Sequence, residues 1–214
     1  MILHQKLERF LPSQSIDSVV DFIIEEQVKV KISKSRKSKT GDYRSPQNGK
    51  GHCISINHEL NKYEFLITLI HEFAHLKTHK KYRSFLRFRN IQPHGKEWKN
   101  EFQTMMRPFL YQTIFPDDIL RSLKTYLLNP AASSCSDTDL QRALRKENPI
   151  DKTMLHLENI PDNTLFALRN GRVFRKIKKM RKNFHCLEIA SNKLFSVSPV
   201  AEVQIVESNK IQLI

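Results

Sequence analysis

The sequence predicts an α+β protein in which a larger N-terminal domain precedes a small, mostly β C-terminal domain. Apolar residues recur at helical spacing in several segments of the first 130 residues, with strand-like alternation between the first of these segments and the second. From about Thr164 onward, short apolar runs alternate with turn residues, which is typical of a small antiparallel sheet or barrel. We therefore place one domain at 1–130 and a second, a short helix followed by antiparallel strands, at 131–214.

The composition, 39% hydrophobic and 27% charged residues, fits a soluble globular protein. No run of about 18 apolar residues occurs, so we expect no transmembrane span and no membrane partner. The N-terminus lacks the basic start and apolar core of a secretory signal peptide, and we therefore expect a cytoplasmic protein. Cys53, Cys135 and Cys186 are far apart and form no C-x-x-C pair, which argues against a disulfide framework and against a cysteine zinc ribbon.

The first predicted helix begins near Ser15 or Asp17, either of which can cap it. Its apolar face is expected to comprise Val19, Val20, Phe22, Ile23 and Ile24. A half-buried strand follows, because three apolar residues alternate with polar ones at Val28, Val30 and Ile32. Residues 34–51 are basic and contain turn-forming residues, so they predict a hairpin with an exposed, positively charged connection, and residues 52–60 predict another strand.

A buried central helix is predicted from Asn61, which caps it with Glu64 three positions later in a capping-box arrangement. After a basic loop, a further helix has four apolar side chains at helical spacing, and we expect them to form a core face: Trp98, Phe102, Met105 and Phe109. Two short helices are predicted over 117–128 and 136–147. Strands are then predicted over 164–168, 172–177, 184–190, 194–198 and 200–206.

The central helix contains HEFAH at residues 71–75, an H-E-x-x-H pattern. Residues four apart lie on one face of a helix, about 6 Å apart along its axis, so His71 and His75 can offer two imidazole nitrogens to one metal ion. Glu72 lies about 100° around the helix from His71 and can take a proton from a water molecule that the metal activates. The pattern arises by chance in some chains, but polar side chains on a buried helix are costly without partners. It therefore predicts a Zn²⁺ site with Glu72 as general base.

A catalytic zinc site of this type needs a third protein ligand. His79 lies about 12 Å along the helix axis from the first histidine of the pattern, too far to share one ion comfortably. Glu97 or Glu101 on the following helix would give a site of two histidines and one glutamate. His94 is the preferred ligand, because Gly95 permits a close approach at the start of that helix.

These residues resemble the SprT-like, or Spartan-type, zinc metalloprotease domain. The resemblance rests on HEFAH at 71–75, HGKEW at 94–98 and the preceding GHCISINHELNKYEFLITLI, and it covers about residues 15–112. It implies a zincin-like fold, zinc bound by His71, His75 and His94, and Glu72 as the catalytic base. Members of the family cleave proteins crosslinked to DNA, and bacterial relatives are often labelled transcription-elongation factors. Many relatives have a cysteine zinc ribbon after the protease domain, which this chain cannot form.

The net charge of +14 indicates a polyanionic partner, of which nucleic acid is the commonest. The candidate contacts lie in two basic clusters: Arg36, Lys37 and Lys39, and Arg172, Arg175, Lys178, Lys179 and Arg181. Such residues bind phosphates in a salt-sensitive way that is largely independent of sequence, although a solvated basic face is the competing interpretation. Phe174 and Phe184 flank the second cluster, where they can stack on bases or, more commonly, belong to a core.

The sequence therefore predicts a zinc-dependent metalloprotease that hydrolyses peptide bonds, with DNA-associated or DNA-crosslinked proteins as the expected substrates. The alternative hypothesis is a non-catalytic protein in which zinc is structural and the chain binds nucleic acid or the transcription machinery. A third is a peptidase with no nucleic-acid partner. An open fourth position at the zinc separates the first hypothesis from the second.

Overall fold

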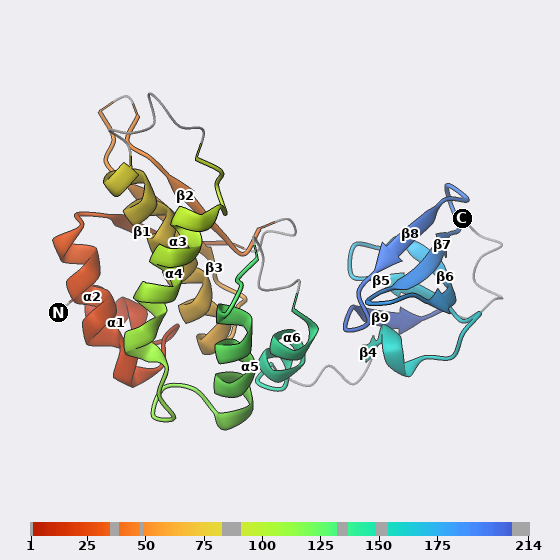
Figure 1. Cartoon of the computed structure of the whole chain (residues 1–214). Coiled ribbons are helices and arrows are strands. Elements are labelled where there is room, and N and C mark those ends of the chain that lie inside the picture. The colour runs from red at the N-terminus through yellow and green to blue at the C-terminus, as the bar shows by residue number, and fades with distance from the viewer. Residues whose placement is uncertain are drawn as a thin grey trace. The chain divides into compact units, whose positions relative to one another are not determined.

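The computed structural model describes residues 2–34, 39–47, 49–82, 91–131, 137–148 and 154–206. The chain divides into two compact units, residues 1–147 and 148–214. The first unit combines helices with a small sheet, whereas the second is built around a larger sheet (Figure 1). The α+β class predicted from the sequence is therefore confirmed.

The first unit contains helices, short 3-10 turns and strands in the following order: α1 (Ile2–Leu7), η1 (Ser13–Ser15), α2 (Ile16–Glu25), β1 (Lys29–Ser33), β2 (Gly41–Arg44), β3 (Cys53–Asn57), α3 (Lys62–Tyr82), α4 (Lys96–Met106), η3 (Arg107–Phe109), α5 (Asp117–Leu127) and α6 (Thr138–Arg145). Each helix predicted from the sequence is present. None of the described helices combines the length and the apolar character that crossing a membrane requires.

The sheet of the first unit has the strand order β1-β3-β2. Strand β3 is central, parallel to β1 and antiparallel to β2, so the predicted hairpin is formed by β2 and β3. Ile54 and Ile56 on β3 are fully buried, in agreement with the alternation in the sequence. Strand β2 is left at an edge of the sheet.

Helix α3 is the central helix of the first unit and packs against β2, β3 and α4. It begins where predicted, because the side-chain oxygen of Asn61 accepts hydrogen bonds from the backbone N–H groups of Tyr63 and Glu64, at 3.1 and 3.0 Å. Most of its residues are buried, including Phe65, which is fully inaccessible. A helix apolar on most sides belongs inside a core, and α3 occupies that position.

Helix α2 differs from the prediction in its N-cap and in the width of its apolar face. Ser15 precedes α2, but its hydroxyl group donates to the carbonyl of Pro12 and makes no capping bond. Ile24 is 64% exposed, whereas Val19 and Ile23 are buried. The predicted apolar face of α2 was therefore too wide.

The unit boundary also lies later than the predicted 130/131. Helix α6 belongs to the first unit, because Leu140 and Leu144 are buried in the same core as α3. The side-chain N–H of Asn61 donates to the carbonyl of Leu144 at 2.9 Å, which ties the end of α6 to the start of α3. The second unit therefore begins with strands and not with the short helix.

The second unit is a six-stranded sheet with the order β4-β9-β5-β6-β7-β8, and all its strand pairs are antiparallel. Its elements are β4 (Leu155–His156), η5 (Leu157–Asn159), β5 (Leu165–Leu168), β6 (Val173–Lys179), β7 (Phe184–Glu188), β8 (Leu194–Val197) and β9 (Glu202–Ile205). Its core includes Phe166, Phe174, Phe184 and Cys186. The two phenylalanines considered for base stacking, Phe174 and Phe184, are thus core residues. Cys53 and Cys186 are free thiols, and Cys135 lies outside the described residues.

Candidate metal centre

Helix α3 places His71 and His75 on one face, as their spacing of four residues predicts. Their Nε2 atoms lie 3.2 Å apart. The helix is continuous through this segment, from Lys62 to Tyr82, so the spacing is set by regular helical geometry and not by a local distortion.

His94 comes from the turn before α4 and joins the pair. Its Nε2 atom lies 3.0 Å from that of His75 and 3.2 Å from that of His71. Gly95 follows at the N-cap of α4, and its backbone N–H closes the turn on the carbonyl of Gln92 at 2.9 Å. A Cβ at Gly95 would lie 3.2 Å from the Gln92 carbonyl oxygen, so a larger residue would crowd this turn.

The three nitrogens fit a zinc ion. Tetrahedral zinc has Zn–N bonds of about 2.0–2.1 Å, which places two ligand nitrogens about 3.3 Å apart. The observed separations of 3.0–3.2 Å agree with that value. A neutral imidazole has one N–H, and three converging Nε2 atoms cannot all satisfy one another by well-aligned hydrogen bonds. A shared cation satisfies all three.

The protonation of the cluster also suits a metal. Burial, reinforced by the neighbouring His75 and His94, lowers the pKa of His71 from 6.5 to about 3. Burial and the nearby His94 lower the pKa of His75 to about 4, and burial lowers that of His94. All three imidazoles are therefore neutral at pH 7, and neutral imidazole is the form that binds metal.

Trp98 forms one wall of the cluster. Its ring centroid lies 4.6 Å from that of His71, 5.4 Å from that of His75 and 4.8 Å from that of His94. Its indole N–H donates to the backbone carbonyl of His71 at 3.4 Å, and Phe102 stacks on the indole ring, 5.1 Å between centroids. Trp98 and Phe102 of the predicted core face are buried and also contact the histidine cluster, whereas Met105 is only partly buried and Met106 is buried in its place.

Glu72 is buried, with 6% of its surface exposed, and its side chain lies against strand β2. A Cβ added to Gly41 of β2 would lie 2.6 Å from the Glu72 Oε1 atom. The carboxylate is therefore held on the side of α3 that faces the sheet, whereas His71 and His75 converge with His94.

The other candidate third ligands lie elsewhere. His79 packs against the rings of Tyr43 and His52, with centroids 6.1 and 5.7 Å away. Glu101 forms an ion pair with Lys81 at 2.6 Å. Among the described residues that can bind a metal, only His71, His75 and His94 bring their ligand atoms within 4.8 Å of one another. The structure thus favours His94 over His79, Glu97 and Glu101.

A comparison with protein families matches the SprT-like family over residues 9–116. The chain belongs to the SprT-like family. The matched range runs from before α2 to just before α5, so it contains the whole sheet of the first unit and both helices that position the histidines. The family is associated with metallopeptidases and with zinc, as the resemblance read from the sequence implies. No curated protein and no solved structure matches the chain.

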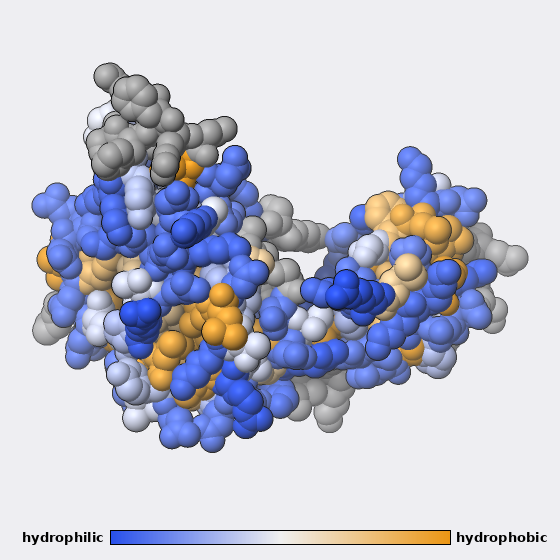
Figure 2. Space-filling view, in the orientation of Figure 1, coloured by the Kyte–Doolittle hydropathy of each residue, from blue (hydrophilic) through white to orange (hydrophobic). Residues whose placement is uncertain are grey.

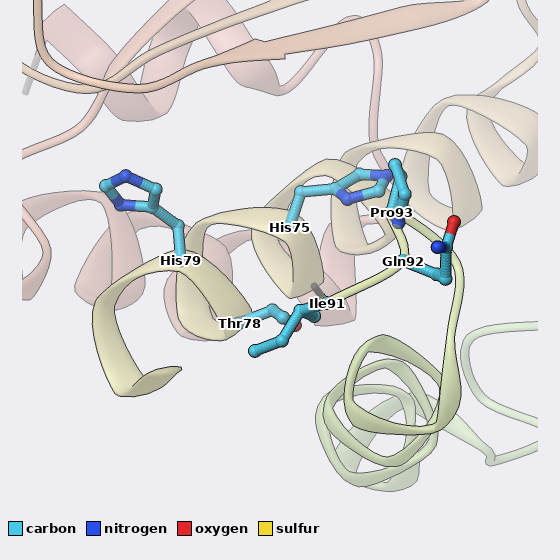
Figure 3. Close-up of a pocket in the computed structure, with 6 residues that line it drawn as sticks. All are labelled: His75, Thr78, His79, Ile91, Gln92 and Pro93. Carbon is cyan, nitrogen blue, oxygen red and sulfur yellow. The ribbon is translucent and has the colours of Figure 1, made fainter. Parts of the chain in front are cut away.

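The SprT-like domain has a pocket of about 190 Å³ beside the histidine cluster. Figure 3 shows it between the second half of α3, which provides His75, Thr78 and His79, and the segment before α4, which provides Ile91, Gln92 and Pro93. The hydroxyl oxygen of Thr78 is buried and makes no hydrogen bond to the described residues. Because His75 lines the pocket, a group bound there would lie next to the candidate metal.

The candidate nucleic-acid contacts of this SprT-like chain fall into three groups. Arg36 and Lys37 lie outside the described residues. Lys39 and Arg172 form ion pairs, Lys39 with Asp42 at 3.0 Å and Arg172 with Glu188 at 2.5 Å. The remaining four are exposed and have no ion-pair partner within the described part of the chain: Arg175, Lys178, Lys179 and Arg181.

Proposed function

We propose that this SprT-like chain is a zinc-dependent peptidase that hydrolyses peptide bonds in DNA-associated proteins. The proposal rests on one observation above all, the mutual separation of 3.0–3.2 Å among the Nε2 atoms of His71, His75 and His94. Zinc bound at such a cluster supplies a Lewis acid for the scissile carbonyl and makes a water nucleophile available near pH 7.

The chain's own residues divide the work of hydrolysis. His71, His75 and His94 hold the metal through neutral nitrogens, and Trp98 keeps their rings in place. The Glu72 carboxylate accepts a proton from the attacking water and then transfers that proton to the nitrogen of the departing amine. Its burial keeps it apart from bulk water, where the proton would exchange freely.

The number of ligands favours an enzyme over a structural zinc site. Within the described parts of the chain, the cluster contains three potential ligands. Structural zinc sites are usually closed by four protein ligands, whereas catalytic sites have three and leave one position for water or substrate. The three-histidine cluster corresponds to the second arrangement.

Strand β2 supports a peptide as the substrate. In the described sheet it is an edge strand, and it packs along α3. An edge strand presents backbone N–H and C=O groups with which an extended peptide can pair. Because Gly41 of β2 lies against Glu72, a peptide paired with this edge would pass close to the carboxylate. The pocket beside His75 then offers room for one of its side chains.

The test of the peptidase proposal is Glu72→Gln, which preserves the shape of the side chain but removes its basicity. The variant should bind zinc in the same stoichiometry as wild type, because Glu72 is not among the clustered ligands. Its turnover of an unfolded protein substrate should fall by about 10²-fold or more, the usual contribution of a general base. Unchanged turnover in the Glu72→Gln variant, or wild-type protein that binds no stoichiometric zinc, would refute the proposal.

The DNA part of the proposal rests on the hairpin of β6 and β7. We call Arg175, Lys178, Lys179, Arg181 and Lys182 the cationic hairpin; all five are exposed, and residues 175–187 contain no acidic side chain. Most of the visible surface is hydrophilic, in keeping with the net charge of +14 (Figure 2). Five exposed cations in a segment without acidic side chains suit contact with a phosphate backbone.

The test of the DNA proposal is the triple variant Lys178→Gln, Lys179→Gln and Arg181→Gln. A matched triple variant, Lys29→Gln, Lys31→Gln and Lys124→Gln, removes the same charge from exposed positions of the first unit. If the hairpin binds DNA, the first variant should lower the slope of log affinity against log salt by about 2–3, because each phosphate contact contributes about 0.7–0.9. The control variant of the first unit should change this salt slope far less. Equal slopes for both variants would show that only the overall charge matters.

The alternative function, a non-catalytic zinc-stabilised protein that binds nucleic acid or the transcription machinery, is favoured by the same hairpin. The two functions predict different results for wild type. The non-catalytic protein would bind zinc and DNA but show no cleavage that depends on Glu72. The peptidase would bind zinc and cleave protein even when the cationic hairpin has been neutralised.

A further inference from the structure

Gly41, the first residue of β2, has no side chain although its backbone conformation does not require glycine. The described glycines with positive φ are Gly49 and Gly171, so Gly41 adopts a conformation open to other residues. Glycine within a strand usually weakens it, because it costs more backbone entropy and adds no packing. A different constraint must account for glycine at this position.

That constraint is the close approach of β2 to the Glu72 side chain. A Cβ at Gly41 would lie 2.6 Å from the Glu72 Oε1 atom and 2.9 Å from its Cγ atom. It would also lie 2.7 Å from the Thr68 Cγ2 atom, one turn earlier on α3. All three distances are below the roughly 3.5–4.0 Å at which heavy atoms normally meet, so any side chain at 41 must displace its neighbours.

Strand β2 cannot easily move away to make room. Gly41 pairs with Ile56 of the central strand, which is fully buried. The carbonyl of Thr40 accepts a hydrogen bond from the backbone N–H of Asn57 at 2.8 Å, which fixes the start of β2 on β3. On the other side of the contact, α3 is buried along most of its length. Of the atoms that a Cβ at 41 would meet, the Glu72 Oε1 atom lies at the end of a side chain, so the Glu72 carboxylate is the group that would have to shift.

We propose that Gly41 is a positioning residue for catalysis, and that its missing side chain sets where the Glu72 carboxylate lies. The inference rests on the proposed function, in which Glu72 is the general base. Strand β2 then has two roles: its outer edge, which is unpaired within the described sheet, can pair with a substrate peptide, and its inner face limits the position of the base. A substitution at 41 would disturb catalysis while leaving the three histidines untouched.

The test compares Gly41→Ala with Gly51→Ala. Gly51 is a matched control, because its φ is also not positive and an added Cβ there would meet no atom within 4 Å. Gly41→Ala should bind zinc like wild type and should lower kcat by about 10²-fold, the order of loss expected for a misplacement of about 1 Å, with KM nearly unchanged. Gly51→Ala should match wild type. Crystal structures of both metal-free variants should show the Glu72 carboxylate displaced only in Gly41→Ala.

A double-mutant cycle separates positioning from a general structural effect. In a Glu72→Gln background, Gly41→Ala should cause little further loss of residual activity, because the group through which it acts is already disabled. A full additional loss in that background, a loss of zinc, or a kcat equal to that of Gly51→Ala would overturn the inference. If wild type itself lacks Glu72-dependent activity, it is the proposed function that fails, and the displacement seen in the crystal structures still tests the contact.

A third variant keeps the test valid if Gly41→Ala folds poorly. Thr68→Ser removes the Cγ2 methyl group that the new Cβ would meet, without changing the contact with Glu72. The double variant Gly41→Ala, Thr68→Ser should therefore fold and still have a low kcat. The single variant Thr68→Ser should fold and keep the kcat of wild type. Recovery of wild-type kcat in the double variant would mean that packing against Thr68 was the relevant contact, and the inference would be wrong.

Discussion

The third histidine, His94, is the residue that completes the candidate metal site. His71 and His75 alone give two donors, and two imidazoles bind zinc far more weakly than three that converge. His94→Ala should therefore abolish stoichiometric zinc binding. His79→Ala is the matched control, since His79 is on the same helix but packs against Tyr43 and His52. Zinc content measured on the purified variants checks this, and loss of zinc in the control with retention in His94→Ala would reverse the assignment.

The depressed pKa values of the cluster make the metal-free protein sensitive to acid. Burial lowers the pKa of His71 from 6.5 to about 3 and that of His75 to about 4, so below pH 6.5 the unfolded chain takes up protons that the folded chain does not. Stability should therefore fall as pH decreases from 6.5 towards 4. Urea unfolding of the protein, with metal removed by a chelator, measures this change in stability between pH 6.5 and 4.

The control for this acid sensitivity is the double variant His71→Asn, His75→Asn. It removes the two groups whose protonation differs most between the folded and unfolded states, so its stability should vary less between pH 6.5 and 4. If the pH dependence is the same in wild type and in the double variant, other groups are responsible.

At the residue scale, the sequence predicts the candidate metal ligands better than it predicts the residues that pack around them. His71 and His75 follow from helical spacing, and His94 follows from ligand chemistry and the glycine beside it. Trp98 was predicted as a core residue, and its second role as a wall of the histidine cluster depends on how α4 packs on α3. The sequence predicts Gly41 only as one of the turn-forming residues of 34–51, because its contact with Glu72 joins residues whose approach is set by the sheet. Local patterns contain no signal for such a contact.

Asn61 caps the start of helix α3 and also connects this helix to α6. Asn61 accepts hydrogen bonds from the N–H groups of Tyr63 and Glu64, and it donates to the carbonyl of Leu144 on α6. Asn61→Ala loses both interactions and should lower the free energy of unfolding by about 1–3 kcal/mol. Asn61→Asp retains the cap but cannot donate, so it should cost about 1 kcal/mol. Chemical denaturation distinguishes them, and equal losses would mean that the cap contributes nothing.

At the scale of elements, the sequence predicts which segments form helices and strands better than it predicts which of their side chains are buried and which strands pair. The apolar positions of α2 cover too wide an arc for one contact face: at about 100° per residue, Ile24 lies about 140° from Val19 and turns out to be exposed. The sequence predicts the short strand β2 only as part of a hairpin, since GDYR has no clear alternation. Its pairing with β3 comes from tertiary packing against α3, which single-sequence patterns do not contain.

At the scale of the whole chain, the position of the domain boundary also depends on tertiary packing, which sequence patterns do not contain. A change in composition near residue 130 suggested a new domain, but the linker there only separates α5 from α6. Helix α6 is eight residues long, too short to be stable alone, and its apolar residues Leu140, Ala143 and Leu144 need the core of the first unit. Nothing in its sequence says which neighbour provides that core. The position of the boundary therefore depends on packing and could not be read from composition.

Two separate hydrophobic cores suggest that the two units divide the proposed function. The first core contains the helices that hold the histidines, and the second lies within the six-stranded sheet that contains the cationic hairpin. A fragment of residues 1–147 should therefore fold, bind one zinc ion and cleave an unfolded protein in a Glu72-dependent way. It should bind DNA more weakly than the full chain and with a smaller salt dependence, since the cationic hairpin is gone.

A fragment of residues 1–130 is the matched comparison. It ends at the boundary predicted from the sequence and therefore lacks α6. Without Leu140 and Leu144 to cover the core, and without the carbonyl that Asn61 bonds, it should be less stable than the 1–147 fragment by several kcal/mol, as for the loss of buried leucines. Thermal unfolding and zinc content of the two fragments measure the difference. Equal stability would mean that α6 is dispensable, and unchanged DNA affinity in the 1–147 fragment would move the DNA contact from the cationic hairpin to the first unit.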